Sequence, residues 1–468
     1  MAFYAQEEWK MTDRFKVSYG LRVDKPLYFD TADLIQKFID TDNGATRDLS
    51  TTYFDPSTGE AVNLDSTVLP SDKLLLSPRL GFNLDVKGDK TFQVRGGTGI
   101  FTGRLPFVWI GNQVSGADDG FFQIVDPDFQ FPQVWRTSVG ADYKFKNNIV
   151  LTGDFAYTND INGVHVQNWG LRTPTGRLAG VDNRNIYTAN NKGANNAFVL
   201  TNSGQGRVIN ASFKAAKNFS NNLYASVAYS YLDSKDVNSI EAEITGDAFA
   251  GNPALGDVNN DVLSYSRYGD KHRIIGVASK KWSYGDNGKY ATTISGFVEF
   301  AQGNRFNYVY AGDINNDGSA INDLLYIPTA DEIDQMTFSG AGQAAAFEEY
   351  IQQDDYLSDN RGAYAERYGA ISPWRNRVDI KLLQDFNINV GERTNTIQLS
   401  LDVLNIGNLI NSDWGVVQQA NNTQVLGVSV DETNTPTYTF DPDLVETFGF
   451  DSSLNSRWQA QFGLRYIF

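Results

Sequence analysis

The last stretch of the chain, residues 456–468, constrains the fold more than any other. Its residues alternate between two faces. One face carries Trp458, Ala460, Phe462, Leu464, Tyr466 and Phe468, and the other carries Gln459, Gln461, Gly463 and Arg465. This alternation predicts a β-strand with one apolar and one polar face. The rings on the apolar face and the aromatic terminal residue are typical of a strand in an outer-membrane barrel.

The same alternation recurs in twelve earlier segments, which makes about thirteen strands in all. Most segments have nearly the ~9–11 residues that a tilted strand needs to cross a bilayer. In 272–282 the face is ambiguous, because Ile274 and Ile275 compete for the apolar side. The earlier segments are 3–11, 14–24, 77–86, 91–101, 133–143, 149–158, 207–217, 223–232, 272–282, 290–300, 377–386 and 396–403.

The connections between these segments alternate strictly between short and long. The long ones are 25–74, 103–132, 159–206, 233–271, 302–374 and 406–455. Transmembrane barrels have this arrangement, with short periplasmic turns and long extracellular loops. No apolar run approaches the ~18–20 residues of a membrane-spanning helix. The predicted fold class is therefore all-β, an antiparallel transmembrane β-barrel in the Gram-negative outer membrane.

The strand count predicts that the chain is only a portion of its barrel. With thirteen strands the first and the last run in the same direction, whereas a closed antiparallel barrel needs an even number. The amino-terminal residues MAFYAQEEWK contain no signal peptide, which an outer-membrane protein requires. Both observations lead us to expect a carboxyl-terminal barrel portion.

Composition argues against several classes of function. The net charge of −17 disfavours nucleic-acid binding, which needs a basic surface. The chain has no cysteine, and its two histidines, His165 and His272, are far apart in the sequence. Thiol chemistry is therefore excluded, and neither a histidine-rich site nor a catalytic triad is expected. We expect no enzymatic activity.

One motif predicts a metal site within the longest loop. Asp313, Asn315 and Asp317, followed by Gly318, match the start of an EF-hand calcium loop. The acid expected at the twelfth position is missing, because Leu324 stands there and Asp323 precedes it. We expect Ca²⁺ on Asp313, Asn315, Asp317 and Asp323. The alternative is a loop rich in Asx turns that binds no metal.

The same loop contains a predicted helix over 343–355. Phe347, Tyr350, Ile351 and Asp354 share one face at helical spacing. This face is expected to pack on neighbouring loops, and a ligand-gripping role is the alternative.

Several stretches together resemble TonB-dependent outer-membrane transporters of the Oar-like kind, which carry a carboxypeptidase-regulatory-like domain. The stretches include FYAQEEWK (3–10), YGLR (19–22), LSPRLGF (76–82), VRGG (94–97), DINNDG (313–318), NDLLYIP (322–328) and WRNRVD (374–379). The resemblance implies a barrel of about 22 strands with a plug. Residues 1–468 would be its carboxyl-terminal part without the plug, and 302–374 would be a long extracellular loop.

The last strand also resembles the signal that the barrel-assembly machinery reads. The matching residues are Gln461, Gly463, Tyr466 and Phe468. The alternative is an ordinary amphipathic strand whose aromatic end is coincidental. By resemblance, the other partners are outer-membrane lipid, a plug domain, the TonB energising complex and a surface lipoprotein.

The resemblance implies uptake of a large ligand, which would be a peptide, a protein or a glycan. Two alternatives stay open at this point. One is a passive porin or structural barrel, and the other is a secreted, soluble all-β adhesin or carbohydrate-binding protein.

Overall fold

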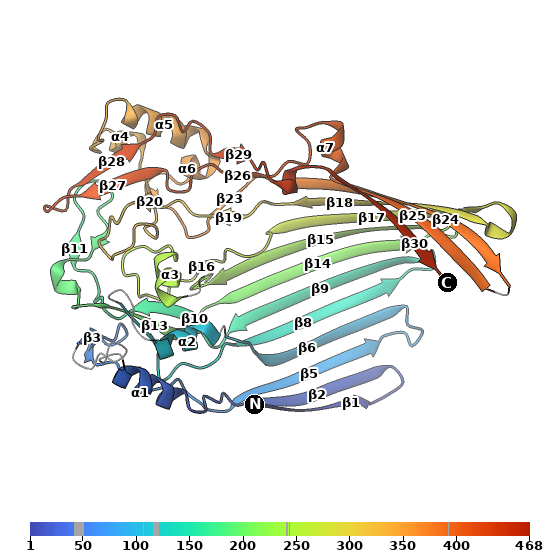
Figure 1. Ribbon diagram of the computed structural model, residues 1–468, viewed down its shortest axis with the longest axis horizontal. Helices are drawn as coiled ribbons and strands as arrows, with labels where there is room; N and C mark the ends of the chain where they lie inside the picture. The colour runs from blue at the N-terminus through green and yellow to red at the C-terminus, as the bar shows by residue number, and fades with distance from the viewer. Residues whose placement is uncertain (42–50, 106, 116–120, 240–241, 243, 392) are drawn as a thin grey trace.

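The computed structural model describes residues 1–41, 51–105, 107–115, 121–239, 242, 244–391 and 393–468. Glu392, in the predicted turn 390–393, lies outside these residues. Thirteen long strands form one antiparallel sheet in the order in which they occur in the sequence (Figure 1). They are β1 (Ala2–Lys10), β2 (Phe15–Asp24), β5 (Leu75–Asp85), β6 (Phe92–Thr102), β8 (Gln133–Lys144), β9 (Ile149–Asp160), β14 (Arg207–Asn218), β15 (Leu223–Asp236), β17 (His272–Tyr284), β18 (Tyr290–Ala301), β24 (Arg375–Val390), β25 (Arg393–Leu404) and β30 (Gln459–Ile467).

The predicted strands are confirmed in number and order, with small differences at their ends. The short strand β16 (Ser264–Tyr265) also joins the sheet by pairing with β15. The last strand begins at Gln459 and not at Ser456, because residues 454–456 form the 3₁₀ turn η3 (Leu454–Ser456). The Ser456 hydroxyl is occupied there, accepting a hydrogen bond from the Val417 N–H at 2.9 Å. Within the sheet, β1 and β30 run in the same direction and do not pair with each other.

The register gives the sheet one apolar face along its whole width. Ile274 lies opposite Tyr229 and Phe300, whereas Ile275 lies opposite Ala228 and Glu299. Ile274 therefore belongs to the apolar face, which resolves the ambiguity in this strand. Large apolar side chains on this face remain exposed, as the 80% exposure of Phe462 illustrates. A continuous exposed apolar surface of this kind requires a non-aqueous neighbour.

The opposite face is polar, and ion pairs connect its neighbouring strands. Arg95 on β6 contacts Asp142 on β8 and also Asp154 on β9, the latter at 2.6 Å. At the other side of the sheet, Lys381 on β24 lies 2.7 Å from Asp402 on β25. These pairs hold the register of the strands on the side away from the apolar face.

The long connections contain the helices and the remaining strands, most of which gather at one end of the sheet, on the left in Figure 1. The helices are α1 (Thr31–Thr41), α2 (Phe107–Ser115), α3 (Thr245–Ala250), α4 (Ala330–Ile333), α5 (Gln343–Gln353), α6 (Asp355–Asp359) and α7 (Ile406–Ile410), with the 3₁₀ turn η1 (Ala189–Asn191); a further 3₁₀ turn, η2 (Asp286–Gly288), lies in a short turn at the other end. The strands are β3 (Tyr53–Phe54), β4 (Ala61–Val62), β7 (Phe121–Val125), β10 (Gly163–Asn168), β11 (Gly176–Arg177), β12 (Asn185–Ile186), β13 (Asn196–Ser203), β19 (Arg305–Phe306), β20 (Tyr310–Ala311), β21 (Tyr326–Ile327), β22 (Ala363–Tyr364), β23 (Ala370–Ile371), β26 (Gln418–Ala420), β27 (Leu426–Val430), β28 (Pro436–Phe440) and β29 (Phe448–Phe450).

None of the described helices combines the length and the apolar character that crossing a membrane would require.

The hydrophobic cores of the described chain lie in these long connections, which we call the loop body (the described residues of 25–74, 103–132, 159–206, 233–271, 302–374 and 406–455). The largest core joins Leu178, Tyr310 and Phe440, which come from three different connections. A second core surrounds Trp109 and Leu200, and a third surrounds Tyr53 and Val199. The long connections are thus a folded layer, whereas the sequence predicts them only as loops.

Candidate functional site

The predicted calcium motif forms a tight turn between β20 and β21. The Asp313 carboxylate accepts hydrogen bonds from the N–H groups of Asp317 at 3.0 Å and Gly318 at 2.9 Å. The turn places Asn316 at φ 61° and Gly318 at φ 98°, where glycine and asparagine are best tolerated. Three of the four predicted ligands, Asp313, Asn315 and Asp317, therefore lie within one turn of backbone.

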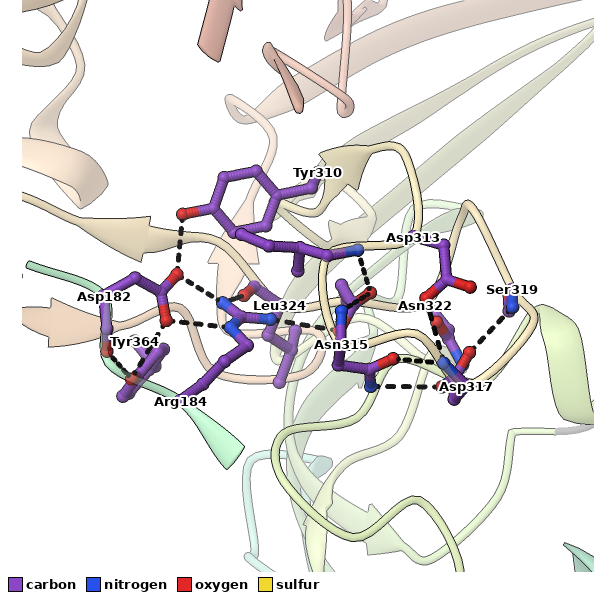
Figure 2. A network of polar contacts seen from close by, with 12 residues as sticks. Asp182, Arg184, Tyr310, Asp313, Asn315, Asp317, Ser319, Asn322, Leu324 and Tyr364 are labelled. Carbon is purple, nitrogen blue, oxygen red and sulfur yellow. Dashed lines mark hydrogen bonds and ion pairs between the residues drawn. The ribbon is translucent and has the colours of Figure 1, made fainter. Parts of the chain in front are cut away.

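Asp317 occupies the buried side of this turn. Its Oδ2 atom accepts hydrogen bonds from the side-chain amides of Asn322 at 2.9 Å and Asn315 at 3.2 Å (Figure 2). Burial, followed by the negative charge of Asp313, raises the pKa of Asp317 to about 6. The amide oxygen of Asn322 is buried and has no hydrogen-bond partner among the described residues.

The fourth predicted ligand, Asp323, is directed elsewhere. Its Oδ1 atom accepts a hydrogen bond from Arg184 Nη1 at 3.0 Å, and its Oδ2 atom accepts one from the Ile314 N–H at 3.1 Å. Asp323 therefore attaches the turn to a different connection. Over the described part of the chain, no three His, Cys, Asp or Glu side chains are grouped as a metal site requires. A cation at this turn would consequently need amide or backbone oxygens as well.

Arg184 is the centre of this network, although no local sequence pattern points to it. Its Nε and Nη2 atoms lie 2.8 and 2.9 Å from the two carboxylate oxygens of Asp182, and Nη2 also donates to the Leu324 carbonyl at 2.6 Å. Burial by itself lowers the pKa of the Arg184 guanidinium. The neighbouring negative charges of Asp182 and Asp323 have the larger combined effect, so the pKa of Arg184 is raised. The hydroxyls of Tyr310 and Tyr364 both donate to Asp182 (Figure 2).

The predicted helix over 343–355 is confirmed as α5, which ends at Gln353, while Asp355 begins α6. Phe347, Tyr350 and Ile351 are fully buried in the largest core, and Phe347 lies 5.3 Å from Phe440, measured between ring centroids. Asp354 lies between the two helices and caps the start of α6, where its carboxylate accepts a hydrogen bond from the Leu357 N–H at 2.7 Å. The predicted face therefore packs on neighbouring connections.

The residues of the predicted assembly signal lie on both faces of β30. Gln461 and Gly463 are on the polar face, opposite Asp402 and Ser400 of β25. A Cβ atom at Gly463 would lie against the Ser400 hydroxyl oxygen. On the apolar face, the rings of Tyr466 and Phe468 stack with centroids 5.9 Å apart.

Comparisons with known proteins agree with this architecture. Residues 1–117 match the family described as "Outer membrane beta barrel domain". No curated protein matches the chain.

The chain is also similar to several solved structures. The siderophore receptor PirA from Pseudomonas aeruginosa shares 8% identity, over 86% of this chain and 44% of that one, with a TM-score of 0.37. The outer-membrane transporter YddB from Escherichia coli shares 10% sequence identity, over 99% of this chain and 54% of that one, with a TM-score of 0.42. The RagAB peptide transporter shares 11% sequence identity, over 99% of this chain and 56% of that one, with a TM-score of 0.30. The chain thus spans about half the length of these structures.

The single antiparallel sheet with one apolar face and the matching family lead to the same conclusion. The chain has the architecture of an outer-membrane β-barrel and is located in the Gram-negative outer membrane.

Proposed function

We propose that the chain, residues 1–468, forms the carboxyl-terminal transport barrel of an Oar-like, TonB-dependent outer-membrane receptor. The observation that carries the proposal is the loop body, which has hydrophobic cores of its own at one end of a sheet with a polar face. A passive pore needs no such folded layer over its entrance, whereas a receptor needs a preorganised surface for its ligand.

In this proposal the loop body faces the cell exterior and captures a large ligand, and the polar face lines the path inward. The segment 302–374, the longest of the connections, is an extracellular loop in this proposal. Long loops are extracellular in barrels of this class. A peptide, a protein or a glycan fits a surface built from several connections, and the proposed role is not catalytic.

The proposed partners follow from this role. Lipid covers the apolar face, and the barrel-assembly machinery inserts the chain by reading Gln461, Gly463, Tyr466 and Phe468. A plug domain closes the lumen, the TonB complex supplies the energy, and a surface lipoprotein assists in ligand capture.

A test uses the complete gene product that contains this chain, purified in detergent. Binding to the immobilised periplasmic domain of TonB, together with little conductance in planar bilayers, is the expected result. Large constitutive conductance without TonB binding would overturn the proposal in favour of a passive porin.

We further propose that Asp313, Asn315 and Asp317 bind a calcium ion that stabilises the loop body, and that Asp323 positions the turn through Arg184. Among the described residues, Asp313 and Asp317 form no ion pair, and the buried side-chain oxygen of Asn322, whose amide contacts Asp317, has no hydrogen-bond partner. Carboxylate and amide oxygens are the ligands that Ca²⁺ prefers.

The test of this site compares thermal unfolding with calcium and with a chelator. Calcium at about 100 times its Kd should stabilise the wild-type loop body by about 2.7 kcal/mol, and Asp317→Asn should remove most of this gain. Asp331→Asn, at an exposed position in α4, is the matched control and should respond like the wild type. Equal protease resistance of 302–374 with calcium and with chelator would contradict the site.

A further inference from the structure

A cavity of about 320 Å³ lies where the sheet meets the loop body. We call it the mouth pocket, and its lining includes Arg104, Trp109, Asp160, Asp236, Asn238 and Tyr268. Asp160 and Asp236 are the last residues of β9 and β15, and the register places both on the polar face of the sheet. Part of the pocket lining therefore belongs to the polar face, which lines the proposed path of the ligand.

Asp160 is the unusual group in this pocket. Its carboxylate has no hydrogen-bond or ion-pair partner in the described parts of the chain, although the residue is half-buried. Two glycines make room for it, because a Cβ atom at Gly206 would overlap its Oδ2 atom and one at Gly163 would lie 2.8 Å from the same atom. The backbone thus accommodates a carboxylate that forms no ion pair with any described residue.

The neighbouring acid, Asp236, is compensated. Its carboxylate lies 3.0 Å from Arg367 Nη2 and accepts a hydrogen bond from the Ser239 hydroxyl at 2.8 Å. The negative charge of Asp236 still acts on Asp160. One uncompensated carboxylate next to a second acid is a site that favours a cation.

Two further groups in the pocket are available to a ligand. The Nδ2 atom of Asn238 is buried and has no acceptor among the described residues, while its Oδ1 atom accepts a hydrogen bond from the Val166 N–H at 3.0 Å. The exposed Arg104 forms no ion pair with any described residue. Trp109 and Tyr268 add aromatic rings to the wall, and such rings attract organic cations.

We propose that the mouth pocket binds an ammonium or guanidinium group on an apolar stem, such as the side chain of a lysine or arginine in a peptide. Asp160 holds the cationic group, and Asn238 and Arg104 donate to carbonyl oxygens of the same ligand. This inference rests on the proposed receptor function, and within it the pocket selects basic peptides.

The experiment measures binding by calorimetry to the complete, detergent-purified gene product. The probes are Nα-acetyl-lysine amide, its uncharged counterpart Nα-acetyl-norleucine amide, and Nα-acetyl-glutamate amide. The lysine probe should bind at least about 10-fold more tightly than the other two, because a charge-assisted hydrogen bond contributes that much. Asp160→Asn should remove the preference. Asp128→Asn, an exposed acid at the same end of the molecule, should retain it.

The wild-type comparison alone is sufficient to test the proposal, even if Asp160→Asn fails to fold. Equal binding of the lysine and norleucine probes, or an unchanged preference in folded Asp160→Asn, would overturn it. Failure to bind TonB with the lysine preference intact would refute the transporter proposal and leave the pocket assignment standing.

Discussion

Arg184 illustrates how a single residue stabilises the loop body. Its guanidinium compensates Asp182 and Asp323, which come from two different connections, and all three side chains are buried. Arg184→Met would leave two buried carboxylates without a counter-charge. We expect this variant to lose about 3–5 kcal/mol of stability in the loop body.

Limited proteolysis of the purified proteins checks this expectation. Arg184→Met should be cleaved inside 302–374 at protease concentrations that the wild type withstands. Arg177→Met is the control, because Arg177 is exposed in the same connection. Equal resistance of the wild type and Arg184→Met would show that the network contributes little.

Gly463 offers a test of what the last strand requires. A methyl group there would lie against the Ser400 hydroxyl, which must rotate away, so we expect Gly463→Ala to lose about 1 kcal/mol, at the low end of overpacking costs. Adding Ser400→Gly removes this contact and should restore assembly, measured as the heat-modifiable band in the outer membrane. No rescue by Ser400→Gly would mean that the assembly machinery reads the glycine itself.

Sequence proximity explains which site residues could be predicted. Asp313, Asn315 and Asp317 are local in the chain, and their spacing alone places them in one turn. Arg184 is 139 residues from Asp323, and no local pattern reports such a contact. The mouth pocket was missed for the same reason, since its walls come from several connections.

At the scale of elements, the sheet strands were predictable because their alternation is a local signal. The ends of the strands were less predictable. For example, β24 runs from Arg375 to Val390 and extends beyond the predicted 377–386 at both ends. The small strands of the loop body carry too few residues to show a period. Pairs such as β20 and β27 form only because distant segments meet.

Helix α5 gives a prediction at this scale. Phe347 is fully buried between Phe338 and Phe440. Phe347→Ala should cost the loop body about 3–5 kcal/mol through the lost ring and the cavity left behind. The exposed Glu349→Ala on the same helix is the control. In Phe347→Ala, we expect protease to cleave the loop body while the barrel remains heat-modifiable. Loss of the heat-modifiable barrel in this variant would contradict the prediction.

For the whole molecule, assembly into the membrane should depend on the end of β30. Phe468 is 89% exposed and stacks on Tyr466. We expect Phe468→Ala to lower the amount of heat-modifiable protein in the outer membrane several-fold. Leu464→Ala removes a comparably exposed side chain from the apolar face of the same strand. Equal losses in both variants would indicate a general hydrophobic requirement and no specific signal.

The architecture of the whole molecule was predictable, and its distribution of buried residues was not. Counting strands gives the thirteen-stranded path, but the alternation says nothing about where the hydrophobic cores lie. They lie in the long connections, because the apolar face of the sheet is directed outward.

The joining of Leu178, Tyr310 and Phe440 in one core has a consequence for immune recognition. The surface above this core is made of segments from three connections that are far apart in the sequence. Its epitopes are therefore discontinuous. In the proposed orientation, with the loop body outside the cell, antibodies raised against linear peptides from 302–374 should bind intact cells poorly, whereas antibodies raised against the folded protein should bind them well.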